Sequence, residues 1–423
     1  MGLQWEQLEK EAIRCIKCGA CQTVCPIFKE LEAESTVARG KINLIKAVIK
    51  GDVEPGETFK ERMSWCLACK ACVENCPSGV KVDHLVIEAR QKLNDDNGLP
   101  LIKKAVFRLG LRNRKLFDLG LNMGSIFQNL LFRKVPHSKG MLPRLPMGLD
   151  KRRLLSPLAE KTFRNGNREF TATEGAEKTV AFFTGCMINH IYPQIGEGVL
   201  KLFKHNNANV LIPKNQHCCG TPAYVNGDID TAKELARAVI DNFTNDQVDA
   251  VITACGSCGV ALKKEYLEFF KDEPAYLEKA KALSEKTYDI AEYLSINGLM
   301  GNLHEIRQTV TYHESCHLGR GLKVKKQPRE LLKAIPGLEL REMKEPGRCC
   351  GAAGSFSLSH YDLSMRINSH KVKDIAQTNA HILVTGCAAC MMHIKDGLHQ
   401  NNKEGIKVMH TVEVLAQAYG DEE

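Results

Sequence analysis

The cysteines of this 423-residue chain constrain its fold more than any other feature, because all eighteen fall into four ordered groups. Two groups near the N-terminus share the spacing Cys-x2-Cys-x2-Cys-x3-Cys-Pro. Two groups in the C-terminal half share a wider pattern, Cys … Cys-Cys-Gly … Cys-x2-Cys. Cysteines repeated at such fixed spacings indicate metal ligands, which are favoured over disulfides in a reducing compartment.

The N-terminal groups have the spacing of two-cluster ferredoxins. In those proteins, three cysteines of a run bind one [4Fe–4S] cluster and the fourth binds the other cluster. Four thiolates also suit a tetrahedral zinc ion, so a pair of zinc knuckles remains the alternative. The spacing predicts one cluster on Cys15, Cys18, Cys21 and Cys76, and a second on Cys66, Cys69, Cys72 and Cys25.

The C-terminal half is an internal duplication. Cysteines of the first copy recur in the second after 130 to 132 residues, pairing Cys186, Cys219 and Cys258 with Cys316, Cys350 and Cys390. Short apolar strands alternate with helices around them, which predicts parallel sheets with right-handed crossovers. The cysteines come directly after strands, so three loops at one sheet edge could converge on one site. The expected strands are 179–184, 210–213 and 250–253, then 309–313, 338–341 and 381–385.

These patterns predict a fold of mixed α+β and α/β class. A helical, ferredoxin-like domain with two [4Fe–4S] clusters is followed by a duplicated α/β cysteine-rich domain with parallel sheets. The expected domains are residues 1–98, a basic helical segment and linker over 99–175, a first repeat over 176–300 and a second over 301–423.

The net charge of +8 comes from residues 101–153, which contain thirteen Lys or Arg and only two Asp. No nucleic-acid motif accompanies the basic segment, and aromatic residues are few, so we expect no nucleic-acid partner. Residues 101–132 have an amphipathic helical pattern, and we expect the remainder to be linker. The helix could lie on an anionic membrane. The alternative, which we favour, is that its apolar face packs on the cysteine-rich domain or on a partner subunit.

Several motifs beyond the cysteine spacing carry a family resemblance. The repeated C-terminal pattern resembles the cysteine-rich (CCG) domain of the heterodisulfide reductase and glycolate oxidase families. "ARGKINLIKAVIKG" (38–51), "CPSGVKVDHLV" (76–86), "HESCHLGRG" (313–321) and "CCGAAGSF" (349–356) are similar to the iron–sulfur subunit of bacterial glycolate or D-lactate dehydrogenase. The resemblance covers the chain except for about residues 100–175.

The resemblance implies further clusters, one or two [4Fe–4S] clusters of a noncubane type. A structural zinc ion in one copy, with an idle fifth cysteine, remains the alternative. Histidines near these cysteines could relay protons, and His217 and His317 are weak catalytic candidates. The implied ligands are Cys186, Cys218, Cys219, Cys255 and Cys258 in the first site, and Cys316, Cys349, Cys350, Cys387 and Cys390 in the second.

No Gly-x-Gly-x-x-Gly motif follows an expected strand, so we expect no flavin or nucleotide on this chain. Substrate oxidation releases two electrons while a cubane cluster accepts one, which calls for a flavin-bearing partner. The resemblance implies an FAD-linked 2-hydroxy acid dehydrogenase subunit as donor, and a quinone or another carrier as acceptor. Alternatively, the chain is itself a heterodisulfide reductase-like catalytic subunit. In the first case the chain is an enzyme only as part of an oxidoreductase complex.

The first fourteen residues are charged and contain no apolar stretch, so we expect no secretory signal. No apolar run approaches eighteen residues, so we expect no membrane-spanning helix. We therefore expect a cytoplasmic protein that could lie at the inner face of the membrane.

Overall fold

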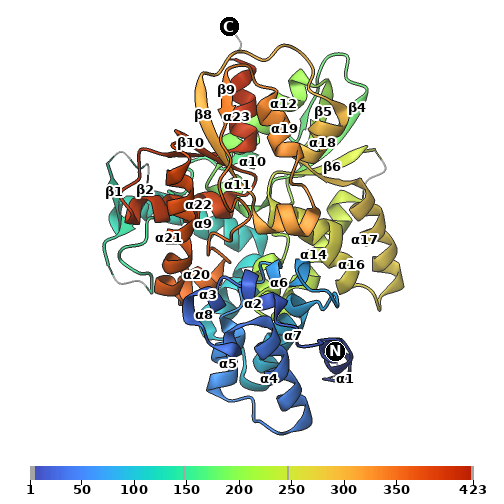
Figure 1. Cartoon of the computed structure of the whole chain (residues 1–423). Coiled ribbons are helices and arrows are strands. Elements are labelled where there is room, and N and C mark those ends of the chain that lie inside the picture. The colour runs from blue at the N-terminus through green and yellow to red at the C-terminus, as the bar shows by residue number, and fades with distance from the viewer. Residues whose placement is uncertain (1–4, 137, 139, 146–147, 245–246, 421–423) are drawn as a thin grey trace.

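The computed structural model describes residues 5–136, 138, 140–145, 148–244 and 247–420. Its N-terminal part is helical and lies at one end of the molecule, below two α/β units built from the C-terminal half (Figure 1). The prediction of a helical ferredoxin-like part followed by two α/β cysteine-rich units is therefore confirmed.

The N-terminal part is built around helices that flank the cysteine loops. Helix α4 is amphipathic, buries Ile42 and Ile45, and is capped at its C-terminus by Gly51, whose φ of 77° suits glycine. The short helices α2 and α6 each begin two residues after the second cysteine of a run. The helices are α1 (Trp5–Ala12), α2 (Ala20–Val24), α3 (Phe28–Leu31), α4 (Ala38–Lys50), α5 (Glu57–Ser64), α6 (Ala71–Glu74) and α7 (Val82–Asn97), with a 3-10 turn, η1 (Glu34–Thr36).

The first repeat forms a five-stranded sheet of order β3-β5-β4-β6-β7, parallel except for β3. The three predicted strands are present within two residues, and β3 and β7 are additional strands that we did not predict. The strands are β3 (Phe170–Thr171), β4 (Lys178–Phe183), β5 (Ala208–Leu211), β6 (Ala250–Thr253) and β7 (Thr287–Asp289). The helices are α11 (Gly185–His190), α12 (Pro193–His205), α13 (Thr221–Tyr224), α14 (Ile229–Phe243), α15 (Gly256–Val260), the π-helix η3 (Ala261–Glu265), α16 (Tyr266–Phe269), α17 (Pro274–Lys286) and α18 (Ile290–Asn297).

The second repeat forms a fully parallel sheet of order β11-β10-β8-β9. It too ends in a strand that we did not predict, β11. The strands are β8 (Gln308–His313), β9 (Leu338–Leu340), β10 (Ile382–Thr385) and β11 (Lys407–His410). The helices are the π-helix η4 (His317–Leu322), α19 (Gln327–Lys333), α20 (Ser355–Ser359), α21 (Tyr361–Gln377), α22 (Ala388–Gln400) and α23 (Thr411–Ala418).

The middle segment corrects two of our expectations. The helix predicted over 101–132 is divided at Asn113, whose side chain accepts a hydrogen bond from the Leu116 N–H and so caps a new helix. The expected linker contains a β-hairpin, which cross-strand pairing stabilises and which the proline-rich sequence concealed. The elements are α8 (Leu101–Lys104), the π-helix η2 (Ala105–Leu111), α9 (Arg114–Leu131), β1 (Phe132–Val135), β2 (Gly140–Pro143) and α10 (Phe163–Gly166).

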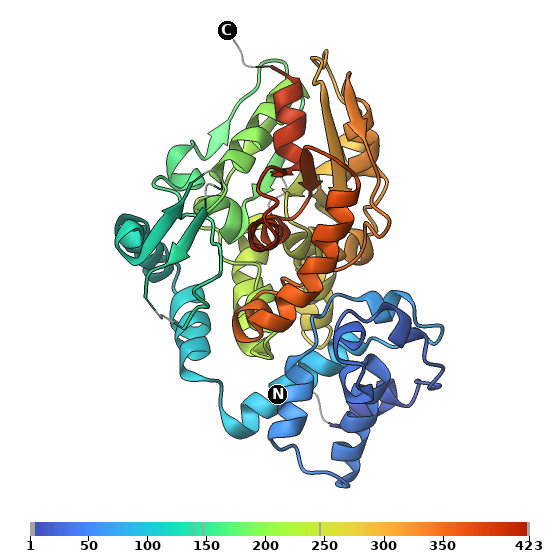
Figure 2. The same cartoon turned by 60° about the vertical axis from the view of Figure 1, so that its left-hand side comes forward.

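One hydrophobic core joins both repeats, and Phe107, Leu111 and Phe163 of the middle segment contribute to it. Helix α23 of the second repeat packs on α12 of the first, where a Cβ on Gly198 would lie 2.8 Å from a methyl group of Val412. The middle segment runs from the helical part up the left-hand side of the α/β pair (Figure 2). This shared core holds the carboxyl edges of the two sheets in a single arrangement.

Candidate iron–sulfur sites

The first N-terminal site is a cavity of about 30 Å³ beside α2 and α4. Lys17 and Gly19 have positive φ, which lets the loop curl so that its thiols face inward. The Cys18 residue is exposed. The cysteines that line this cavity are Cys15, Cys18, Cys21, Cys72 and Cys76.

The second N-terminal site is a neighbouring cavity of about 30 Å³. Burial raises the pKa of the Cys25 thiol to about 11. The backbone N–H of Ala68 donates a hydrogen bond to Cys66 Sγ at 3.4 Å, as backbone amides do toward cluster thiolates. Cysteines that line the cavity are Cys25, Cys66, Cys69 and Cys72. Each loop thus meets the last cysteine of the other run, Cys72 borders both cavities, and the ligand assignment stays a prediction.

Both cysteine-rich groups open into one central cavity of about 370 Å³. They meet because each group sits at the carboxyl edge of its own parallel sheet, and these two edges face each other across the shared core. The cavity is lined by all ten cysteines predicted for the two sites: Cys186, Cys218, Cys219, Cys255, Cys258, Cys316, Cys349, Cys350, Cys387 and Cys390.

Within each group, hydrogen bonds between thiols shift neighbouring pKa values in opposite directions. The bond to Cys186 raises the pKa of Cys218 far above its usual value, and the bond to Cys218 lowers that of Cys219. In the second group, the bond between Cys316 and Cys349 raises the pKa of Cys316 and lowers the pKa of Cys349. So many buried sulfurs in mutual contact are the donor set of a thiolate-bound cluster, and the residues fit such a group.

Two thiol contacts connect the groups to one another. Cys255 of the first repeat hydrogen-bonds Cys387 of the second. Cys349 of the second repeat hydrogen-bonds Cys69 of the N-terminal part. A continuous row of sulfur atoms therefore runs from the second N-terminal site through the second repeat to the first repeat.

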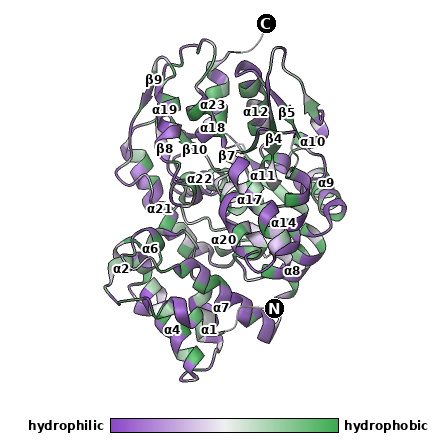
Figure 3. Ribbon diagram, turned by 90° about the vertical axis from the view of Figure 1, so that its right-hand side faces the viewer, coloured by the Kyte–Doolittle hydropathy of each residue, from purple (hydrophilic) through white to green (hydrophobic). Residues whose placement is uncertain are grey.

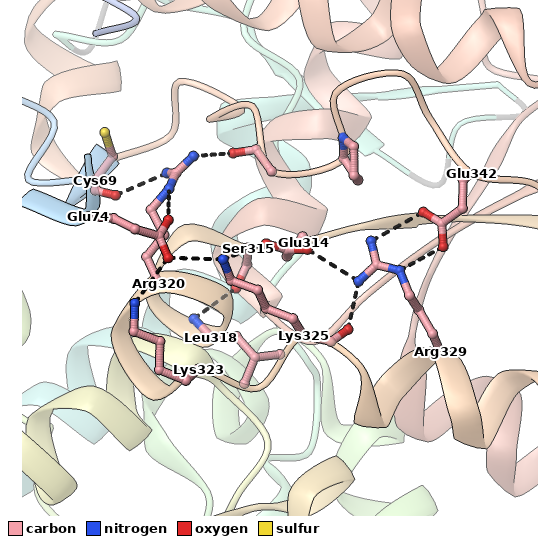
Figure 4. A network of polar contacts seen from close by, with 12 residues as sticks. Cys69, Glu74, Glu314, Ser315, Leu318, Arg320, Lys323, Lys325, Arg329 and Glu342 are labelled. Carbon is pink, nitrogen blue, oxygen red and sulfur yellow. Dashed lines mark hydrogen bonds and ion pairs between the residues drawn. The ribbon is translucent and has the colours of Figure 1, made fainter. Parts of the chain in front are cut away.

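Arg320 holds the N-terminal part against the second repeat (Figure 4). Its guanidinium donates to the backbone oxygens of Cys69, at 3.1 Å, and Gly347, and lies 3.5 Å from the Glu74 carboxylate. Burial lowers the pKa of Arg320, but the nearby Cys69, Cys316 and Cys349 sulfurs more than offset this and raise it. Glu74 also accepts from Lys323 and Lys325 at 3.0 and 2.9 Å. A cation thus sits where the sulfur row crosses between the two parts.

The two predicted histidine candidates lie in different places. His317 lines the central cavity, where its Nδ1 is 3.6 Å from Cys316 Sγ and burial lowers its pKa to about 4. His217 lines a smaller cavity beside Cys186, and burial lowers its pKa. Their catalytic roles stay predictions.

His313 is one of the histidines near the cysteines in the sequence, but it was not among our two catalytic candidates. It is fully buried at the end of β8, and burial lowers its pKa far below the usual value. One of its nitrogens lies within 4.8 Å of both Cys350 Sγ and Cys390 Sγ, and neither nitrogen has a hydrogen-bond partner among the described residues. Its position as the last residue of a strand, three residues before Cys316, was the available signal.

Comparisons with known proteins agree with this architecture. A model of the 4Fe-4S dicluster domain matches residues 11–80, and a model of the cysteine-rich domain CCG matches residues 180–263 and 310–395. A lactate utilization protein A of Halalkalibacterium halodurans is 36% identical over 56% of this chain and 96% of its own. A fumarate reductase (CoM/CoB) subunit of Methanothermobacter marburgensis is 27% identical over 96% of this chain and 72% of its own.

The full-length likeness is to a glycolate oxidase subunit. The probable glycolate oxidase iron-sulfur subunit of Bacillus subtilis is 32% identical over 97% of this chain and 95% of its own. Similarity over this length includes the middle segment as well as both kinds of cysteine group. The chain therefore belongs to the family of glycolate oxidase iron–sulfur subunits.

Proposed function

We propose that this chain is the electron-transfer subunit of an FAD-linked 2-hydroxy acid dehydrogenase, with glycolate or D-lactate as the substrate class. Electrons from the flavoprotein would pass the two N-terminal sites, then the second repeat, then the first repeat, and leave to a quinone or another carrier. The chain would also make a peripheral membrane contact through residues 101–153, at the inner face of the membrane. The row of contacting sulfurs between Cys69 and Cys186 is the single observation that supports this route most directly.

The proposal assigns a [4Fe–4S] cluster to each of the four cysteine groups. With noncubane clusters in both repeats, the chain would bind about sixteen iron atoms. When bound, such clusters supply one-electron transfer, and the role of the protein is to hold them, bury them and set their potentials. Zinc in every site would instead give a colourless protein without iron.

Substrate-driven reduction of the holo-complex tests the relay. The anaerobically purified complex is mixed with D-lactate or glycolate, and the cluster signals are followed by electron paramagnetic resonance. We expect reduction within turnover time in the wild type and loss of dehydrogenase activity in Cys25→Ser and Cys76→Ser. Absence of a co-purifying flavoprotein, together with substrate-independent cluster signals, would contradict the relay.

A second candidate function is disulfide reduction, favoured by the central cavity that both repeats line. A disulfide that accepts two electrons and two protons yields two thiols, and clusters on both sides could each supply one electron. Reduced viologen and a small disulfide, with the isolated iron-loaded chain, distinguish this function from the relay. Thiol production without any flavoprotein would favour the reductase.

A further inference from the structure

Helix α9 turns an apolar face toward solvent. Its six large apolar side chains on that face are 48–73% exposed, whereas a surface helix normally buries its apolar stripe. At about 100° per residue, they fall within a strip roughly 100° wide. The opposite face meets the protein, because Gln128 is buried and exchanges hydrogen bonds with the backbone of Leu158. The exposed residues are Leu116, Leu119, Met123, Ile126, Phe127 and Leu130.

The preceding helices continue this exposed surface. Phe107 and Leu111 of η2 are buried in the shared core and fix the segment in place. The other side of α8 and η2 exposes Leu101, Ile102, Val106 and Leu109. Figure 3 shows α8 and α9 along the same side of the molecule. We expected the apolar face to pack on the cysteine-rich domain or on a partner subunit. The first part is wrong for these residues, since only Phe107, Leu111 and part of Phe117 reach the core, and packing on a partner subunit stays a prediction.

The basic residues of the segment divide into two sets. Arg108 and Arg112 form ion pairs with Asp228 and Glu234 of the first repeat, which anchor the helices to the protein. Arg114 pairs with Asp118 within α9 and donates a hydrogen bond to the backbone oxygen of Gln216. A second set is exposed around the apolar strip and makes no ion pair among the described residues. Asp118 is the one acidic residue between positions 99 and 149 and it is paired with Arg114, so every unpaired charge that this segment itself offers is positive. The second set comprises Lys104, Lys115, Arg133 and Lys134.

We propose that α8, η2, α9 and the β1–β2 hairpin form a docking surface for the anionic leaflet of a membrane. The apolar strip would enter the boundary between headgroups and acyl chains, and the unpaired cations would meet lipid phosphates. Apolar insertion and a polybasic patch are the two signals that stable peripheral binding requires. A surface whose available charges are all positive fits an anionic lipid sheet better than a protein partner, whose surface carries charges of both signs.

The inner face of α9 connects this surface to the sulfur row. Arg114, Phe117 and Asp118 line the small cavity that also contains Cys186 and His217. The Phe117 ring contacts the His190 ring edge-on, with centroids 5.6 Å apart. The first repeat would therefore be the place where electrons leave toward a lipid-soluble acceptor. This part of the inference rests on the proposed relay, whereas membrane binding itself does not.

Vesicle flotation of the full chain, loaded with iron and sulfide, tests the surface. Vesicles are made from phosphatidylcholine alone or from a phosphatidylcholine–phosphatidylglycerol mixture. We expect the wild type to float with the anionic vesicles and less so at high salt. Ile126→Gln/Leu130→Gln and Arg133→Glu/Lys134→Glu should each weaken binding about tenfold or more. Matched controls outside the surface, Ile296→Gln on α18, which is 66% exposed, and Lys403→Glu, should float like the wild type.

Iron content per chain and dye-linked electron transfer of each variant should equal those of the wild type, which separates failure to dock from failure of the relay. No flotation of the wild type, or equal flotation of wild type and surface variants, overturns the proposal. Loss of flavoprotein binding by the surface variants, without any flotation of the wild type, would assign the surface to the partner subunit and also overturn it.

Discussion

The two cysteine-rich repeats share a fold and a cysteine pattern, yet their surroundings differ. His190 and Arg320 follow the first cysteine of each repeat by four residues and so occupy equivalent positions. His190 lies 3.2 Å from Asp118 on α9, and Arg320 lies 3.5 Å from Glu74 on α6. The same position thus joins the first repeat to the proposed membrane-docking segment and the second repeat to the N-terminal sites. The two copies of the duplicated site therefore have different neighbours, which supports the proposed direction of electron transfer from the N-terminal sites through the second repeat to the first repeat.

Removing one proposed cluster ligand from either repeat should give the largest difference between the repeats, measured as the rate at which each is reduced by substrate. Cys350→Ser in the second repeat and Cys219→Ser in the first each remove a thiol from the middle of the sulfur row. We expect each variant to lose about four iron atoms per chain. In Cys350→Ser, reduction of the first repeat by substrate should fall by about a hundredfold or more, because the row is interrupted before it. In Cys219→Ser, the second repeat should still be reduced at the rate of the wild type.

Freeze-quench paramagnetic resonance with iron analysis measures this difference. Equal loss of reduction in both repeats for both variants would contradict the order of sites.

Arg320→Gln and the matched His190→Gln should have smaller effects than loss of a cluster ligand. Arg320→Gln removes a contact with the N-terminal part, and His190→Gln removes a contact with α9. Loss of a buried, charge-assisted contact costs about 1.5–3 kcal/mol, so Arg320→Gln should loosen the N-terminal part. Removing a cation near Cys69, Cys316 and Cys349 should also lower the reduction potentials of the sites on either side. His190→Gln should leave those potentials unchanged. Potentiometric titration checks both, and unchanged potentials in Arg320→Gln would show that the arginine is only structural.

The last strand of each repeat ends in a titratable residue, and these two residues make the stability of the fold depend on pH in opposite ways. Asp289, the last residue of β7, caps α18 by accepting from the Ala291 N–H, and His410, the last residue of β11, caps α23 by accepting from the Val412 N–H. Burial raises the pKa of Asp289 to about 7 and lowers that of His410 to about 4. Asp289 therefore stabilises the fold at low pH, and this contribution is lost as pH rises through about 7. His410 contributes stability above its unfolded pKa of about 6.5, lost as pH falls toward 4.

Asp289→Asn keeps the cap and removes the charge. We expect it to stabilise the protein by about 1–3 kcal/mol at pH 8 and by less at pH 6. Thermal unfolding by circular dichroism under anaerobic conditions at both pH values checks this. A gain that is equal at pH 6 and pH 8 would show that Asp289 does not titrate in this range.

Most secondary structure around the cysteines followed from the sequence. The apolar run before Cys186 predicted β4, because buried parallel strands are apolar, and the β-branched and aromatic residues before Cys316 predicted β8. The short strands β7 and β11 were missed, since three or four residues carry no periodic signal and pairing with a neighbouring strand stabilises them. The hairpin of residues 132–143 was missed for the same reason.

The spacing of the cysteines by itself determined that the chain carries four cysteine groups, because residues three or four positions apart in a loop lie close in space and the wider C-terminal pattern recurs in two copies. It also determined the duplication and the family. Only the tertiary structure decided that Cys255 meets Cys387 and that Cys69 meets Cys349, because these contacts join segments more than a hundred residues apart. The first pair lies in the shared core, and the second lies in a separate apolar cluster between the N-terminal part and the second repeat. Packing likewise decided which face of α9 is buried, since an amphipathic pattern predicts a face but not the surface that covers it.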